Sequence, residues 1–404
     1  MSLITGLFNL LALLYIGRAV QLAIQVIRNW NAVRQEPLTR EKQRLAEQAA
    51  FFLGVPPAVF VHELAHALAI VLFGGRVAEF GYRVFWGYVV PVGTFTAIEN
   101  WIIAVAGTLG SLAFGALVWL GLRRNESRTL QYFGVRAYRF QIYFSLVYYP
   151  LFSLFLPIGD WRVIYDFSAT PVISAVTLVV HAAALLLFWR ADRAGWFEMA
   201  AFDSVAAQRQ AGELRVAANA GDLMVQLRLI EQVWNGGARN RARRLLRDFL
   251  AQHPQVAEAH LQRANMASGG DRWQFNKEAY DAAGRALELG LDQTDHWAYA
   301  HQIRGLYLLE QGDGAAAQAE FDAALTPTAV HHPDEMKPLR RAELHHARSQ
   351  AYRRQGRFEA AYAENAVALH LAREMNHEQA YREYAQEREI IEKHAGRSLA
   401  GSLP

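Results

Sequence analysis

Hydrophobic residues form long unbroken stretches in the first half of the chain and shorter, regularly spaced clusters in the second half. Five stretches in the first half are close to or longer than the roughly 20 residues that an α-helix needs to cross a bilayer. They are residues 3–27, 49–73, 97–122, 140–157 and 171–189. Beyond residue 190 the apolar positions recur at helical spacing between Ala-rich and charged surfaces. The pattern predicts a membrane half joined to a soluble half.

Two similar segments in the soluble half indicate an internal repeat. Residues 298–328 and 342–371 place small and aromatic residues at the spacing of a helical hairpin, and Gly356 stands 44 residues after its counterpart Gly312. Each segment resembles a tetratricopeptide repeat. Weaker copies are found at residues 236–253 and 257–289. Stacked hairpins of this kind form an α-solenoid whose concave face suits a peptide or a partner protein.

The predicted fold is therefore all-α, with a polytopic membrane helix bundle of about five spans followed by an α-solenoid of tetratricopeptide-like hairpins. The expected domains are a transmembrane domain at residues 1–190, a linker helix at 191–222 and the repeat domain at 223–404. Residues 74–95 are an exception, because Gly pairs, β-branched and aromatic residues and a Pro predict a short β-hairpin there. That hairpin could receive a substrate as an added strand, or it could be an ordinary surface turn.

Composition narrows the choice of ligands and partners. The formal net charge is +3, and no run of five to eight Lys or Arg residues occurs, so we expect no nucleic-acid partner. The chain contains no Cys, which excludes disulfides, thiolate zinc ligands and a Cys nucleophile. A metal site in this chain must use His and carboxylate ligands.

A metal-binding motif lies inside the second apolar stretch. The sequence VHELAHAL, at residues 61–68, places His62 and His66 four residues apart, on one face of a helix, where both imidazoles can bind one zinc ion. Glu63 lies beside them as a candidate general base. An acidic side chain at bilayer depth costs about 2.5–3.5 kcal/mol, which favours a functional role over a merely satisfied polar cluster.

A third ligand is expected where the fourth apolar stretch ends. Pro150, Pro157 and Gly159 should loosen or break the helix just before Asp160, and would present its carboxylate within or near the membrane. Asp166 is the alternative, but it follows Arg162 in more polar sequence. We therefore expect Asp160 to complete the site.

The remaining histidines of interest are expected to be structural. His181 lies in the fifth apolar stretch, where a single His is more often a buried hydrogen-bonding group than a ligand. Four histidines of the repeat region are expected to be solvated side chains, because they fall on a loop and a polar helix. They are His331, His332, His345 and His346.

Three protein ligands leave one position on zinc for water, as in catalytic sites. Zinc lowers the pKa of that water to about 7, and Glu63 could accept its proton as hydroxide attacks a carbonyl. The constellation of His62, His66, Asp160 and Glu63 best serves peptide hydrolysis.

These residues resemble the site-2 protease family, zinc metalloproteases that cut substrates within or beside the membrane. The resemblance covers residues 51–167 and rests on HELAH, the GGRV hairpin, the small-residue AGTLGS helix and the Pro-Xaa-Gly-Asp turn. It implies that His62, His66 and Asp160 bind zinc, that Glu63 is the catalytic base and that the hairpin receives an unwound substrate. The second motif departs from the family, since Gly159, Asp160 and Trp161 replace Leu-Asp-Gly and no Asn precedes Pro157 at the usual place.

Partners and location follow from this interpretation. We expect an integral membrane protein of the bacterial cytoplasmic (inner) membrane. Its expected substrate is a membrane-anchored protein. The repeat domain would bind a protein or peptide partner. Positively charged loops tend to lie in the cytosol, so the basic residues at 28–44 and 123–139 predict a cytosolic repeat domain. The site-2 protease family orients its HExxH helix in the opposite direction across the membrane, which would place the repeat domain on the other side.

Two other classes of function fit parts of the sequence. A membrane-anchored scaffold would use the repeat domain alone, with HELAH vestigial. A transporter would also place ionisable residues at midplane, although the five stretches show no evident repeat symmetry. Zinc content and a requirement for Asp160 distinguish the enzyme from the scaffold.

Overall fold

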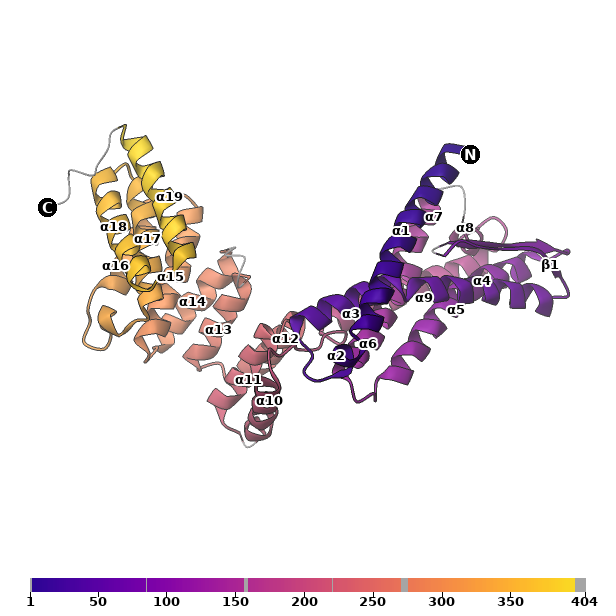
Figure 1. The fold of residues 1–404 in the computed structure, drawn as a ribbon, viewed down its shortest axis with the longest axis horizontal. Helices are drawn as coiled ribbons and strands as arrows, with labels where there is room; N and C mark the ends of the chain where they lie inside the picture. Colours follow the sequence, from indigo (N-terminus) through magenta and orange to yellow (C-terminus); the bar gives the residue numbers. More distant parts are fainter. Residues whose placement is uncertain (1, 85, 156–158, 220, 270–274, 397–404) are drawn as a thin grey trace. The chain divides into compact units, whose positions relative to one another are not determined.

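A computed structural model describes residues 2–84, 86–155, 159–219, 221–269 and 275–396. The described residues are nearly all helical, with one two-stranded sheet (Figure 1). The chain divides into two compact units, residues 1–244 and 245–404. The predicted all-α class with one hairpin is confirmed at this level, while the domain limits at residues 190 and 222 stay predictions.

The first unit holds the apolar helices and three short helices that follow them. Its elements are α1 Ser2–Arg28, α2 Trp30–Arg34, α3 Arg40–Phe52, α4 Val55–Leu72, β1 Arg76–Tyr82, β2 Gly87–Val92, α5 Ala97–Leu122, α6 Arg128–Tyr143, the π-helical turn η1 Phe144–Tyr148, α7 Tyr149–Phe155, α8 Trp161–Ile164, α9 Pro171–Arg193, α10 Val205–Ala218, α11 Leu223–Asn235 and α12 Arg239–Gln252. The last of these crosses the division between the units.

Among the described residues, four helical stretches are long and apolar enough to cross a membrane. They are Leu10–Arg28, Arg40–Leu72, Ala97–Leu122 and Pro171–Arg193. They match four of the five predicted spans. The predicted span at residues 140–157 corresponds to the end of α6, the turn η1 and α7, with its last two residues outside the described part of the chain. It is not among the four stretches, so a fifth crossing stays a prediction.

Local sequence explains how α4 and α5 begin. Helix α4 follows Gly54 and has prolines in its first turn, where a missing backbone N–H costs nothing. Helix α5 starts with a capping box, in which the Thr96 hydroxyl accepts from Glu99 N–H and the Glu99 carboxylate accepts from Thr96 N–H at 2.7 Å. The two helices then pack closely, since a Cβ at Gly110 would lie 2.8 Å from Ala65 Cβ.

The predicted hairpin is present and lies against α4 (Figure 1). Its strands β1 and β2 pair antiparallel from Arg76 opposite Val92 to Tyr82 opposite Gly87. The register shifts between Val77 and Glu79, which marks a β-bulge. The Tyr82 hydroxyl donates to the Pro56 carbonyl at 3.0 Å, so the far end of β1 is fixed to the start of α4.

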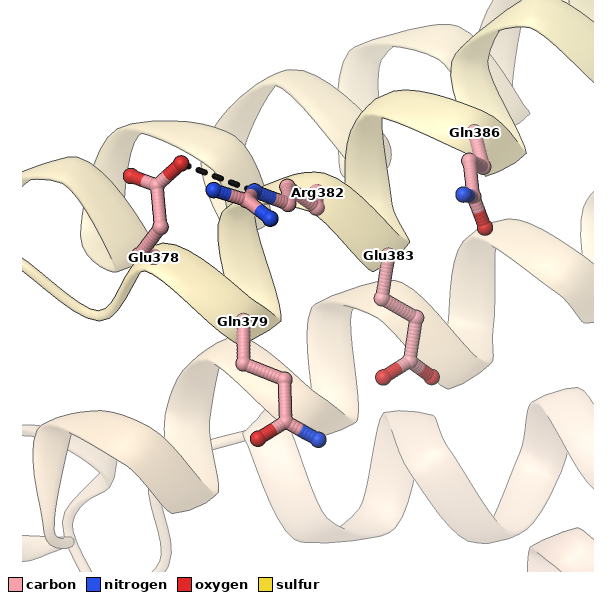
Figure 2. A pocket seen from close by; sticks show the side chains of 5 residues that line it. All are labelled: Glu378, Gln379, Arg382, Glu383 and Gln386. Carbon is pink, nitrogen blue, oxygen red and sulfur yellow. Dashed lines mark hydrogen bonds and ion pairs between the residues drawn. The ribbon is translucent and has the colours of Figure 1, made fainter.

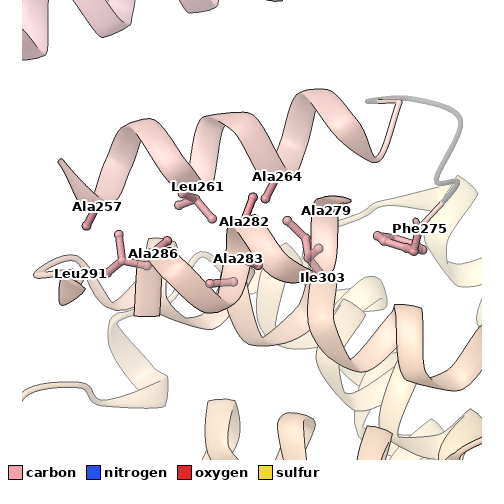
Figure 3. Close-up of a cluster of buried hydrophobic side chains, with 11 residues drawn as sticks. Ala257, Leu261, Ala264, Phe275, Ala279, Ala282, Ala283, Ala286, Leu291 and Ile303 are labelled. Carbon is pink, nitrogen blue, oxygen red and sulfur yellow. The ribbon is translucent and has the colours of Figure 1, made fainter. Parts of the chain in front are cut away.

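The second unit is a series of helices, most of which are joined by short turns. They are α13 Ala257–Ala267, α14 Lys277–Leu289, α15 Thr294–Glu310, α16 Gly314–Leu325, the 3₁₀ turn Pro333–Glu335, α17 Pro338–Arg354, α18 Phe358–Glu374 and α19 Glu378–Ala395. Contacts link each helix to its neighbours in sequence. Small side chains fill much of the core, as the alanine-rich cluster around Leu261 and Ile303 illustrates (Figure 3).

The repeat of 44 residues has a structural basis. Gly312 and Gly356 take φ values of +85° and +75° in the turns that join α15 to α16 and α17 to α18, a conformation that favours glycine. An ion cluster also recurs: Glu320 lies 2.7 Å from both His301 and Arg304. The same cluster occurs 44 residues later, where Glu364 lies 2.7 Å from both His345 and Arg348.

The prediction of four solvated histidines in this unit is wrong for three of them. His331 is buried and stacks on Trp297 with ring centroids 4.6 Å apart, because the loop that carries it folds back on α15. His346 is also buried and stacks on Tyr384 of α19. His345 pairs with Glu364, and only His332 of the four is exposed.

Candidate metal centre

Three of the predicted site residues converge in the first unit. His62 Nε2 and His66 Nε2, from α4, lie 3.0 and 3.1 Å from Asp160 Oδ2. The three ligand atoms lie within 4.8 Å of one another. Two ligands of a tetrahedral zinc ion, held by bonds of about 2.0–2.2 Å, lie about 3.3–3.5 Å apart. Small adjustments would therefore let all three groups hold one ion.

Hydrogen bonds on the far side of each imidazole orient it. His66 Nδ1 lies 2.7 Å from the carbonyl oxygen of Ile103, and His62 Nδ1 lies 3.2 Å from Ser111 Oγ. A carbonyl can only accept, so His66 Nδ1 carries a proton, and in the neutral imidazole Nε2 then holds a lone pair. That lone pair faces a carboxylate oxygen, which is repulsive unless a proton or a cation lies between them. This donor set, with its outer hydrogen bonds, fits a metal ion.

One face of α5 supplies the wall behind the histidines. Ile103, Gly107 and Ser111 are spaced four residues apart, so they lie in one row along the helix. A Cβ at Gly107 would lie 2.3 Å from His66 Nε2 and 2.6 Å from His62 Nε2. Small residues of α5 let it approach α4 closely, and Gly107 additionally leaves the space that the ligand atoms occupy.

Glu63 is buried between α4 and the start of β2, with 5% of its surface exposed. A Cβ at Gly87 would lie 2.5 Å from Glu63 Cγ and 2.9 Å from Glu63 Oε1, so the strand backbone covers this side chain. Within the described ranges, no hydrogen bond to the Glu63 carboxylate is found. The carboxylate is therefore able to accept a proton from a water molecule.

The Asp160 segment contains a residue that sequence reasoning missed. Tyr149 donates its hydroxyl hydrogen to Asp160 Oδ2 at 2.9 Å and accepts the backbone N–H of Asp160 at 3.2 Å. Its ring also meets the His62 ring edge-to-face. No motif marks Tyr149, because its position depends on how α7 packs against the segment that follows it.

Asp166 and His181 lie outside this group. Asp166 Oδ1 accepts the backbone N–H groups of Ser168 and Ala169 at 3.0 and 3.1 Å, so this carboxylate closes an exposed turn. His181 Nδ1 contacts the Tyr165 hydroxyl and its Nε2 lies 2.7 Å from the Leu146 carbonyl oxygen. The structure thus brings Asp160, and not Asp166, to the histidines, and gives His181 the hydrogen-bonding role expected of it.

A shallow depression on α19 of the second unit differs from the candidate metal centre in the residues that line it (Figure 2). It is lined by Glu378, Gln379, Arg382, Glu383 and Gln386. Glu378 and Arg382 pair at 2.9 Å on the exposed face of the helix. The groups that line this depression do not form a cluster of metal ligands.

Comparisons with known proteins leave the family open. No protein-family model matches the chain, and no curated protein matches it. Four chains of solved structures match. One is described as the crystal structure of MamA protein, with 20% identity and a TM-score of 0.31, and the match covers 41% of this chain and 86% of that chain. A similarity this low supports no conclusion about fold or function, so the resemblance to the site-2 protease family stays a prediction from the motifs.

Proposed function

We propose that this protein is a membrane-embedded zinc metalloendopeptidase that hydrolyses peptide bonds of membrane-associated protein substrates. The observation that carries the proposal is the convergence of His62, His66 and Asp160 beside the buried Glu63. A chance HExxH sequence would not bring a carboxylate from 98 residues away to within 3.0 Å of its first histidine. The stretch Arg40–Leu72, which carries the motif, is apolar and long enough to span a bilayer, in keeping with the inner membrane of a bacterium.

Each residue has a defined part in such a reaction. His62, His66 and Asp160 would hold zinc, which when bound supplies an acidified water and polarises the substrate carbonyl. Glu63 accepts the proton of the attacking water at a carboxylate oxygen and returns it to the leaving amine. The Ser111 and Ile103 contacts keep both imidazoles in ligating orientation.

The hairpin and the repeat unit would provide substrate recognition. Strands β1 and β2 form a two-stranded sheet, so each has an outer edge with backbone groups that an extended peptide could pair with. The start of β2 lies against Glu63, so a peptide paired near this point would lie close to the base. The repeat unit would bind the substrate or a regulator through its stacked helices.

The decisive experiment combines metal analysis with a search for uncut substrates. Glu63→Gln should retain one zinc ion per chain and lose activity, so membrane proteins that wild-type cells cleave should accumulate as uncut precursors. Glu126→Gln, a substitution at an exposed position outside the site, should behave as wild type. Equal membrane proteomes for the Glu63→Gln and wild-type cells, together with absence of zinc, would favour a non-catalytic membrane-anchored helical-repeat scaffold.

A further inference from the structure

The third ligand is not fixed by the short helix that it begins. Asp160 is the N-cap residue of α8, a helix of four residues, yet its side chain accepts no capping hydrogen bond. An Asp at this position usually bonds the backbone N–H groups of the next turn. Instead, the Asp160 carboxylate faces away from α8, toward the histidines of α4. Some other contact must therefore hold it there.

Helix α7 provides that contact. Tyr149 and Ser153 are four residues apart and share one face of α7. The Tyr149 hydroxyl bonds both the side chain and the backbone of Asp160, which fixes the residue at two points. Gly159 has φ +112°, and a Cβ there would lie 2.3 Å from Ser153 Oγ. Gly159, which directly precedes Asp160, thus packs against the face of α7 that carries Tyr149.

The turn before α7 sets the direction of this face. The π-helical turn Phe144–Tyr148 separates α6 from α7. A π turn holds more residues than an α turn, so it rotates every later side chain around the helix axis, and such turns are frequent at functional sites. The ring of Tyr149 also stacks parallel to Phe144, with an interplanar angle of 8°. The rings of Phe144 and His62 are thus both neighbours of the phenol whose hydroxyl meets Asp160.

We propose that Tyr149 is a positioning residue, which turns Asp160 Oδ2 away from helix capping and toward the metal. The proposal rests on the metal site of the proposed function. Tyr149 acts through Asp160 and need not touch the substrate. Outer hydrogen-bond partners of metal ligands typically change metal affinity by about 10–100-fold, so an effect of that size is expected when the hydroxyl is removed.

The test measures zinc affinity of the full-length protein in detergent by competition with a chelator. Tyr149→Phe should bind zinc about 10–100-fold more weakly than wild type and still reach one ion per chain at saturating zinc. Tyr132→Phe is the matched control, because it also removes a phenol–carboxylate hydrogen bond, from Tyr132 to Glu47 at 2.6 Å. That variant should keep wild-type affinity. A Tyr149→Phe affinity equal to that of the control would overturn the proposal.

A double-mutant cycle checks that Tyr149 acts through Asp160. Asp160→Asn and the combination of Asp160→Asn with Tyr149→Phe should bind zinc equally weakly, since the phenol then has no ligand to orient. Additive losses would refute this route. A wild-type protein that binds no zinc would overturn the proposed function itself, whereas zinc-binding wild type with an unaffected Tyr149→Phe variant would overturn only the role of Tyr149.

A measurement on the unsubstituted chain covers the case in which Tyr149→Phe does not fold. Protein labelled with fluorotyrosine at its 16 tyrosines can be titrated with zinc and followed by fluorine NMR. Zinc should shift the Tyr149 signal, because the oxygen that its hydroxyl contacts becomes a ligand. A titration that loads one zinc ion and shifts none of the signals would overturn the proposal.

Discussion

Replacing Gly107 by Ala is expected to abolish tight zinc binding. The added Cβ would lie 2.3 Å from His66 Nε2 and 2.6 Å from His62 Nε2. Carbon and nitrogen atoms that are not bonded need about 3.5 Å, so each imidazole would have to move by about 1 Å. Metal–ligand distances tolerate about 0.2 Å. The displaced rings could not share an ion with Asp160.

The same substitution should leave the protein folded. Overpacking a buried site costs about 1–3 kcal/mol, while Ala in place of Gly within a helix returns about 0.5–1 kcal/mol. The net destabilisation is then at most about 2.5 kcal/mol, which is small beside a typical free energy of unfolding of about 5–15 kcal/mol. Loss of metal should therefore be separable from loss of structure.

The assay compares two glycines of the same helix. Full-length wild type, Gly107→Ala and Gly121→Ala are dialysed against a graded series of chelator concentrations, and bound zinc per chain is measured. A Cβ at Gly121 meets nothing within 4 Å, so this variant should match wild type. We expect affinity at Gly107→Ala to fall by at least about 100-fold, more than the loss of an outer-shell partner. Equal zinc retention by the two variants would refute the steric argument.

Three further predictions concern the ligands and the repeat unit. Asp160→Asn should bind zinc much more weakly than wild type while Asp166→Asn keeps wild-type affinity, as measured by competition with a chelator; equal weakening in both would contradict the assignment of the third ligand. Burial, and secondarily Arg353, lowers the pKa of His346 to about 4 from about 6.5, so the unfolded chain binds the extra proton between these values. Stability should therefore fall as pH drops from 6.5 to 4, by up to about 3 kcal/mol, and urea titrations should show a shallower fall for His346→Gln. Phe321→Ala, at a fully buried position, should cost about 3–5 kcal/mol in the same titrations, and a cost below 1 kcal/mol would contradict a tightly packed site around this ring.

The histidines of the candidate site could be predicted because their relation is local. A spacing of four residues places His62 and His66 on one helix face whatever the rest of the chain does. Asp160 could be proposed as a ligand because Pro157 and Gly159 predict a helix break within an apolar region. Tyr149 and Gly107 could not, since their roles depend on how three separate helices approach one another. Gly107 and Ser111 belong to the small-residue segment AGTLGS, but small residues at such positions are equally typical of close helix packing.

The repeat unit shows the same limit. Gly312 and Gly356 revealed the hairpin period, because positive φ in a turn leaves a direct mark on the sequence. The burial of the histidines could not be predicted in the same way. A polar helix considered alone is expected to have one buried face, whereas a helix in a stack is covered on more than one side. His346 faces Tyr384 of α19, and nothing near His346 in the sequence indicates that contact.

The distance along the chain between the ligands has a consequence for biogenesis. His62 and Asp160 are 98 residues apart, so an ion held by both would cross-link α4 to the segment before α8. A chain that has inserted α4 but not yet packed α7 offers only two of the three ligands, and its hold on the ion is correspondingly weak. Metal capture would thus report that Asp160 has reached the two histidines of α4. Newly made chains would stay inert until the Asp160 segment has packed against α4, a safeguard for the proposed hydrolase while it is assembled among other proteins.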